Sequence, residues 1–181
     1  QTLTERFDVA IAGGGHTGLA MALALVHLAG PEIRVGVFER SAPETGGGPP
    51  ADPRAFALAA ASRNLLDALG VWRRVAGWAQ PVEAIDITDS SLENAIRPVL
   101  LSYDNRVQIP AAGVEPENGD LGPATHIVEA EVLRRALLDQ VGLTPSISHI
   151  APAEIGTHDV SPTGVAIMLA DGRTFAAALL I

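Results

Sequence analysis

The stretch VAIAGGGHTGLA, residues 9–20, decides the fold of this chain. Its glycines Gly13, Gly15 and Gly18 follow a short apolar run and precede a longer one. Glycines at this spacing give a nucleotide-binding unit its tight turn, its close backbone approach to a pyrophosphate and its close helix–strand contact. The free N–H groups at the start of the following helix favour an anion. The stretch therefore predicts a dinucleotide-phosphate site where a strand passes into a helix.

The residues on either side of the glycines complete one βαβ unit. The apolar run 7–12 predicts a buried strand, residues 16–29 predict a helix that is apolar almost all round, and the run 33–38 predicts a second strand. Glu39 ends that second strand. A carboxylate there can accept hydrogen bonds from both ribose hydroxyls and disfavours a 2′-phosphate. NAD and FAD sites share this logic, so the unit alone leaves both dinucleotides open.

The middle of the chain departs from the alternation expected of a dehydrogenase. Residues 41–53 are rich in glycine and proline and predict a loop, and residues 55–69 predict a helix. Alternating apolar residues predict a strand over 81–88. The short apolar pieces that follow predict two strands, over 99–103 and 106–109, divided by a turn at Asp104–Asn105.

The last part of the chain predicts a helix and then a hairpin. Apolar residues recur at helical spacing over 131–141. The segment GVAIMLADGRTFAAALLI, residues 164–181, alternates on both sides of Asp171–Gly172 and predicts a β-hairpin that turns there.

Composition narrows the classes of function. All 12 basic residues are arginine, and 21 acidic residues bring the formal net charge to −9, which disfavours nucleic-acid binding. Cysteine is absent and the five histidines lack metal-ligand spacing, so we expect neither a disulfide framework nor a metal site. The longest apolar stretch, residues 19–29, is too short to span a bilayer, and the default location is cytoplasmic.

At residues 52–75, DPRAFALAAASRNLLDALGVWRRV, the sequence resembles the ubiquinone-biosynthesis hydroxylases of the 2-polyprenylphenol hydroxylase type. These are a branch of the FAD-dependent aromatic monooxygenases related to para-hydroxybenzoate hydroxylase. The matching elements are the glycine motif, Glu39-Arg40, the D-x-R of residues 52–54, LGVW at 69–72 and the block LGPATHIVEAEVLRRALL at 121–138. The resemblance covers nearly the whole chain and favours FAD over NAD.

The resemblance implies an α/β fold with a Rossmann-like FAD-binding βαβ unit and inserted β structure, of the para-hydroxybenzoate hydroxylase type. Residues 1–80 would hold the βαβ unit and the following helix. Residues 81–124 would be a small β insertion that is part of the substrate domain, and residues 125–181 would return to the FAD-binding domain.

The resemblance also implies the chemistry. FAD is the cofactor, NAD(P)H supplies electrons, and one oxygen atom enters the ring of a small aromatic substrate, a polyprenylated phenol. Because this chemistry belongs to the cofactor, no catalytic triad is expected. Such a substrate further implies peripheral contact with the inner membrane and a complex with other enzymes of the pathway.

By the same resemblance, a set of residues would touch FAD: Gly13, Gly15, Gly18, Glu39, Arg40, Arg54 and Glu129. The glycines would hold the pyrophosphate, and Glu39 the adenosine ribose with Arg40 beside the adenine. The guanidinium fork of Arg54 suits the diphosphate or the flavin edge. Glu129 would lie near the ribityl chain, although an acid there also complements a helix dipole.

The end of the chain carries its own expectation. Residues 176–181, AAALLI, stop where family members continue into a second FAD motif, Gly-Ala-Asp-Gly. We therefore expect an N-terminal fragment that binds FAD weakly and is inactive by itself. Two other functions stay open, namely a flavin- or NAD-dependent oxidoreductase without oxygen insertion and a non-catalytic flavin-fold assembly protein.

Overall fold

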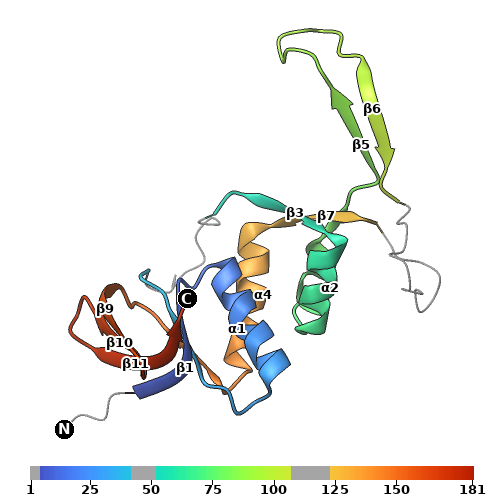
Figure 1. The fold of residues 1–181 in the computed structure, drawn as a ribbon. Helices are drawn as coiled ribbons and strands as arrows, with labels where there is room; N and C mark the ends of the chain where they lie inside the picture. Colours follow the sequence, from blue (N-terminus) through green and yellow to red (C-terminus); the bar gives the residue numbers. More distant parts are fainter. Residues whose placement is uncertain (1–4, 42–51, 107–122) are drawn as a thin grey trace.

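The computed structural model describes residues 5–41, 52–106 and 123–181. Its largest element is a six-stranded sheet with the strand order β8-β2-β1-β11-β10-β9. Figure 1 labels β1, β9, β10 and β11 of this sheet. Neighbouring strands run parallel from β8 to β11 and antiparallel from β11 to β9. The six strands are β1 (Glu5–Ala12), β2 (Val35–Phe38), β8 (Ile147–Ile150), β9 (Ile155–Ser161), β10 (Gly164–Leu169) and β11 (Thr174–Leu180). The prediction of an α/β chain with a parallel sheet is confirmed.

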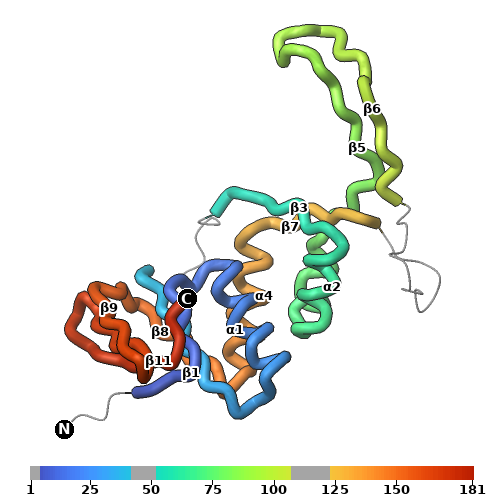
Figure 2. The backbone as a smooth tube through the Cα atoms, viewed as in Figure 1, coloured from blue at the N-terminus to red at the C-terminus, as the bar shows by residue number. Residues whose placement is uncertain are grey.

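The βαβ unit forms as predicted. The first helix, α1 (His16–Ala29), has the predicted bounds and joins the parallel strands β1 and β2. Beside it lies α4 (Ala130–Gly142), which fits the helix predicted over 131–141 (Figure 2). Because α1 packs between the sheet and α4, nearly its whole circumference is apolar.

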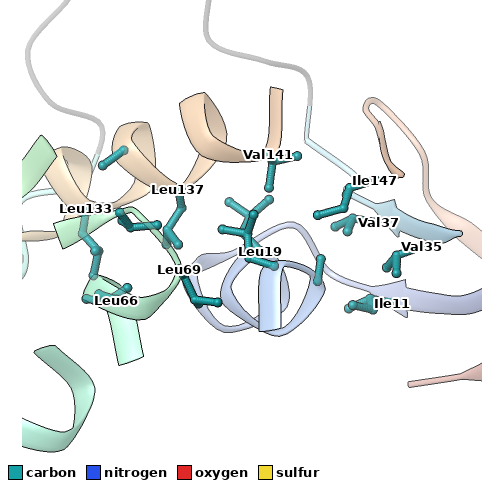
Figure 3. Packing of buried hydrophobic residues seen from close by; sticks show 14 of the residues in the cluster. Ile11, Leu19, Val35, Val37, Leu66, Leu69, Leu133, Leu137, Val141 and Ile147 are labelled. Carbon is teal, nitrogen blue, oxygen red and sulfur yellow. The ribbon is translucent and has the colours of Figure 1, made fainter. Parts of the chain in front are cut away.

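Two apolar clusters hold these layers together. The cluster in Figure 3 joins the sheet to the helices through Ile11, Leu19, Val35, Val37, Leu66, Leu69, Leu133, Leu137, Val141 and Ile147. A second cluster includes the rings of Phe7, Phe38 and Phe175, and the Phe38 and Phe175 centroids lie 5.0 Å apart. The glycine turn thus starts from strands that are buried in both clusters.

The helix predicted over residues 55–69 is wrong in its first part. Residues Ala55–Ala59 form strand β3, which pairs antiparallel with β7 (Thr125–Glu129). Only Ala60–Ala68 form a helix, α2. The alanine-rich stretch favours a helix by local propensity, but pairing with a segment far along the chain overrides that preference.

The leucines of this stretch do not share one buried face. Leu66 and Leu69 are buried, whereas Leu65 is 47% exposed and Leu58 belongs to β3. The chain then makes a short helix, α3 (Trp72–Val75), and a 3₁₀ turn, η1 (Ala76–Trp78).

The β structure between the two helical regions also differs from the prediction. The strand predicted over 81–88 is interrupted and forms β4 (Gln80–Pro81) and β5 (Ala84–Thr88). β5 pairs with β6 (Val99–Asp104), and this hairpin projects from the rest of the molecule (Figure 1).

The turn predicted at Asp104–Asn105 is wrong, because β6 continues to Asp104 and Asn105 is buried at the base of the hairpin. The Asn105 Nδ2 donates to the Val82 carbonyl at 2.7 Å. This tie favours burial of a residue type that is otherwise common in turns. Of the strand predicted over 106–109, only Arg106 is among the described residues.

The predicted C-terminal hairpin is confirmed. β10 and β11 pair antiparallel on either side of Asp171–Gly172, and Gly172 has a φ of +88°. β11 then runs parallel to β1, so Ile181 lies beside the glycine turn. None of the helices within the described ranges is long and apolar enough to cross a membrane.

His126 makes the stability of this fold sensitive to acid. Its ring is buried against Trp72, with ring centroids 5.2 Å apart. Burial lowers the pKa of His126 below its ordinary value of 6.5, and the charge of Arg63 lowers it further. The unfolded chain therefore binds a proton that the folded chain resists, so stability is complete above pH 6.5 and falls as the pH drops through the folded pKa.

We expect the free energy of unfolding to fall as the pH drops below 6.5, and to fall less in His126→Phe, which keeps a ring beside Trp72 but does not titrate. Denaturant unfolding at a series of pH values measures this. Equal pH slopes in the two proteins would contradict a role for His126.

Candidate cofactor site

The glycine turn has the geometry that the motif predicted. Gly13 has a φ of +125°, a conformation that side chains disfavour. A Cβ built on Gly18 would lie 1.9 Å from the carbonyl oxygen of Gly13, so the start of α1 packs directly on the turn. A Cβ on Gly15 would meet no atom within 4 Å among the described residues. The Gly15 position thus faces open space, into which a ligand can approach the backbone.

A cavity of about 710 Å³ opens at this point. Gly13, Gly15 and Gly18 line it together with Arg54, and Phe56 and Leu133 are among its apolar lining residues. The first turn of α1 carries no acidic residue, and its N-cap, Gly15, offers no side chain to the backbone donors. N–H groups at such a helix start are available to an anion.

The Glu39 side chain is hydrogen-bonded to the backbone of the glycine turn. Its Oε2 accepts the Gly14 N–H at 2.9 Å, and its Oε1 accepts the Ser41 N–H at 2.8 Å. Partial burial raises the pKa of the Glu39 carboxyl, but the hydrogen bonds from Ser41 and Gly14 outweigh burial and hold the pKa below its ordinary value. The Ser41 side chain donates to the same carboxylate as well. An ionised carboxylate has about four acceptor sites, so it can still accept a further donor.

A second cavity, of about 380 Å³, lies over Glu39 and Arg40. Ala12 and Gly13 line both cavities, so both border the first glycine of the motif. The parallel strands β1, β2 and β11 all end here, which is where open α/β sheets bind ligands.

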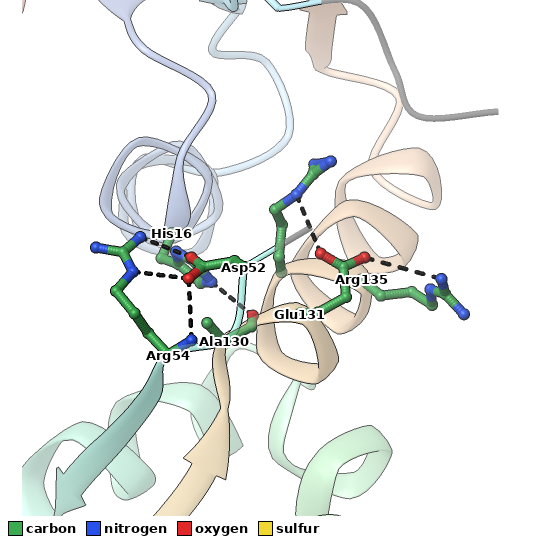
Figure 4. Close-up of polar contacts among 7 residues, drawn as sticks. His16, Asp52, Arg54, Ala130, Glu131 and Arg135 are labelled. Carbon is green, nitrogen blue, oxygen red and sulfur yellow. Dashed lines mark hydrogen bonds and ion pairs between the residues drawn. The ribbon is translucent and has the colours of Figure 1, made fainter. Parts of the chain in front are cut away.

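Arg54 lies at the mouth of the larger cavity, in an ion pair with Asp52. The Arg54 Nε and Nη2 donate to the two Asp52 carboxylate oxygens at 2.8 and 2.6 Å (Figure 4). These bonds lower the pKa of Asp52 to about 2. A guanidinium has five N–H donors, so three remain for a further anion.

Glu129 is placed apart from the other predicted residues. It lines a third cavity, of about 360 Å³, with Arg74, Asp139 and other residues that do not line the glycine cavity. The neighbouring acid, Glu131, pairs with Arg134 and Arg135 at 3.6 and 3.8 Å. A role of Glu129 beside a ribityl chain stays a prediction.

Two parts of the site were missed from the sequence. The His16 ring bonds the Ala130 carbonyl, and Ile181 lines the larger cavity. The sequence could have indicated a role for the His16 side chain, because a large polar ring is unusual inside a glycine turn. The Asp52 side chain also accepts the Arg54 N–H two residues on, at 3.1 Å, and aspartate commonly forms such a turn.

Proteins of similar sequence agree with the family resemblance. No protein-family model matches the chain. The chain is 32% identical to ubiquinone hydroxylase UbiL of Rhodospirillum rubrum over 174 residues, which are 96% of this chain and 36% of UbiL. It is 25% identical to ubiquinone hydroxylase UbiM of Neisseria meningitidis, over 96% of this chain and 35% of UbiM. The chain thus spans about a third of the length of these relatives.

Solved structures of similar fold include monooxygenases. The p-nitrophenol 4-monooxygenase PnpA of Pseudomonas putida superposes with a TM-score of 0.73 at 18% identity, over 97% of this chain and 40% of PnpA. The flavin-dependent monooxygenase PieE, solved with FAD and substrate, superposes with a TM-score of 0.68 at 21% identity, over 97% of this chain and 29% of PieE. The resemblance predicted from the sequence is confirmed: this chain is related in sequence to the ubiquinone hydroxylases and has the fold of the flavin-dependent monooxygenases.

Proposed function

We propose that this chain forms the FAD-binding part of an FAD- and NAD(P)H-dependent aromatic-ring monooxygenase. The observation that carries the proposal is that two cavities border Gly13, one at the start of α1 and the other over Glu39. A dinucleotide contains a charged pyrophosphate, which the cavity at the start of α1 would hold, and an adenosine, which the cavity over Glu39 would hold. The FAD bound in PieE, a solved structure of similar fold, supports FAD among the dinucleotides.

The residues present fit FAD. The side-chain-free Gly15 leaves room for the pyrophosphate at the start of α1. The N–H groups there and the remaining donors of Arg54 supply positive charge. Glu39 keeps its charge and can still accept a hydrogen bond from the adenosine ribose, and Arg40 lines the cavity that would hold the adenine.

The chain's part in the reaction is to bind and orient. FAD, when bound and reduced by NAD(P)H, supplies the oxygen chemistry that hydroxylates an electron-rich ring. Phe56, Leu58 and Leu133 give the larger cavity an apolar wall. Such a wall excludes water from the reacting groups. We propose no catalytic side chain within the described residues.

We also propose a substrate and a location for the protein. The two sequence relatives are named ubiquinone hydroxylases, which supports a polyprenylated phenol of ubiquinone biosynthesis as the substrate. A polyprenyl chain partitions into a bilayer, because each buried CH₂ contributes about 0.8 kcal/mol. We therefore propose a protein on the cytoplasmic side that contacts the inner membrane peripherally and associates with other enzymes of the pathway.

Substrate-stimulated oxidation of NAD(P)H tests this function in the full natural protein. With FAD and a short-chain polyprenylphenol, we expect oxidation to rise at least tenfold over the rate without phenol, with hydroxylated phenol formed in step. Mass spectrometry identifies the product and an ¹⁸O₂ atmosphere the source of its oxygen. Hydrogen peroxide without hydroxylated phenol would mean an oxidase, and FAD binding without stimulated oxidation would mean an assembly protein. Either result would overturn the proposed reaction.

A further inference from the structure

His16 uses its side chain to join the glycine turn to a distant segment. It is the first residue of α1, and its Nε2 lies 2.7 Å from the Ala130 carbonyl oxygen (Figure 4). A carbonyl oxygen only accepts, so Nε2 carries the proton and donates. A phosphate-binding turn uses only the backbone of this residue. The hydrogen bond from the His16 ring to Ala130 is therefore not needed to form the turn.

The connection continues to Arg54, the residue directly before β3. The Ala130 N–H donates to the Arg54 carbonyl oxygen at 2.9 Å. The backbone of Ala130 therefore stands between His16 and Arg54: its carbonyl oxygen accepts from the His16 ring and its N–H donates to the Arg54 carbonyl oxygen. The first residue of α1 and the start of β3 are thereby held on the same short stretch of backbone.

Phe56 makes a second link between the same two residues. The His16 ring meets the Phe56 ring edge to face, with centroids 4.9 Å apart. The Arg54 guanidinium carbon lies 5.8 Å from the same Phe56 centroid. All three residues line the larger cavity. Ring–ring and cation–π contacts favour particular orientations of the groups, so Phe56 helps to orient both the His16 ring and the Arg54 guanidinium.

The Arg54 side chain needs such support because it is 69% exposed, and an exposed ion pair with Asp52 by itself fixes a guanidinium weakly. The hydrogen bonds from Arg54 hold the pKa of Asp52 at about 2, so Asp52 stays ionised beside Arg54.

We propose that His16 is a positioning residue that sets Arg54 at a fixed place over the pyrophosphate-binding end of α1. It acts through its hydrogen bond to Ala130 and its contact with Phe56, without touching the ligand by its ring. The inference rests on the proposed binding of FAD at the glycine turn.

FAD affinities of four variants test the proposal in the full natural protein. His16→Phe keeps an aromatic ring against Phe56 but loses the donor, and we expect FAD to bind about tenfold more weakly, which corresponds to about 1.4 kcal/mol. His16→Gln places an amide donor at similar reach, and we expect binding within about threefold of wild type. If His16 acts through Arg54, the double variant His16→Phe/Arg54→Gln binds no more weakly than Arg54→Gln alone.

The outcomes separate the inference from the function on which it rests. Failure of the wild type to bind FAD would overturn the proposed function. Wild-type binding with an unchanged His16→Phe, or with additive losses in the double variant, would overturn only the role of His16.

Proton-detected ¹⁵N spectra of the wild-type imidazole provide a readout that does not depend on the variants folding. We expect a slowly exchanging proton on Nε2, and a ring that carries its proton only on Nδ1 would overturn the proposal.

Discussion

Gly18→Ala should cost this protein about 3 kcal/mol or more of its free energy of unfolding and abolish FAD retention. The added Cβ would lie 1.9 Å from the Gly13 carbonyl oxygen, a backbone atom that cannot rotate away. Either the turn or the start of α1 must move, and both carry the groups proposed to hold the pyrophosphate. Denaturant unfolding measures the stability, and flavin absorbance after gel filtration measures retention.

Gly15→Ala is the matched control in the same motif. Gly15 has a φ of −75°, which alanine adopts freely, and its Cβ would meet no described atom within 4 Å. We therefore expect wild-type stability, within about 0.5 kcal/mol, because no packing changes. FAD should nevertheless bind at least about tenfold more weakly, since the methyl group enters the space where the pyrophosphate approaches. A Gly18→Ala protein as stable as Gly15→Ala would contradict the packing of α1 on the turn.

Glu39→Ala should weaken FAD binding by about 100-fold. The carboxylate accepts the Gly14 N–H and the Ser41 N–H, and the proposed site adds the ribose hydroxyls. Hydrogen bonds to charged groups each contribute about 1.5–3 kcal/mol, so losing those to ribose and loosening the turn accounts for the expected factor. Fluorescence quenching of FAD on titration with protein measures the affinity.

Two variants control for this result. Glu39→Gln keeps the shape but places an amide group against one of the two donors, so we expect an intermediate loss of about tenfold. Glu5→Ala removes an exposed carboxylate that pairs with Arg34 at 3.5 Å, and we expect no measurable change. An affinity for FAD that is unchanged in Glu39→Ala would remove Glu39 from the site.

The same carboxylate predicts how binding depends on pH. The folded pKa of Glu39 lies below the ordinary value of 4.5. Its contribution to stability is therefore complete above pH 4.5 and is lost as the pH falls through the folded pKa. FAD affinity should accordingly show no loss from Glu39 at neutral or mildly acidic pH.

The parts of the fold that the sequence predicted correctly depend on neighbours in the chain. The helix at His16–Ala29, the strand before it and the hairpin turn at Asp171–Gly172 all follow from apolar periodicity and from the freedom of glycine. The glycine turn belongs to this class, because its spacing and flanking elements lie within one βαβ unit. For that reason the geometry of the turn was predictable without knowledge of any distant contact.

The parts that were predicted wrongly depend on segments far apart. Ala55–Ala59 become a strand only because β7 lies alongside, with Ala55 opposite Glu129. Asn105 leaves the expected turn because the Val82 carbonyl accepts its side chain. Neither partner can be inferred from the local pattern, which in both places favours another structure.

The sequence by itself therefore determined the βαβ unit, its glycine turn and the acidic residue at the end of the second strand. The lack of a side chain at glycine, the spacing of apolar residues and the order of the elements are each set by a few consecutive residues. They can therefore be recognised without knowing which distant segment packs against them. Only the tertiary structure decided that Arg54, Phe56 and Ala130 surround His16, and that Ile181 returns to the same cavity. The reason is physical: a hydrogen bond or ring contact between residues 114 positions apart, such as that of His16 with Ala130, exists only once packing has brought the two segments together.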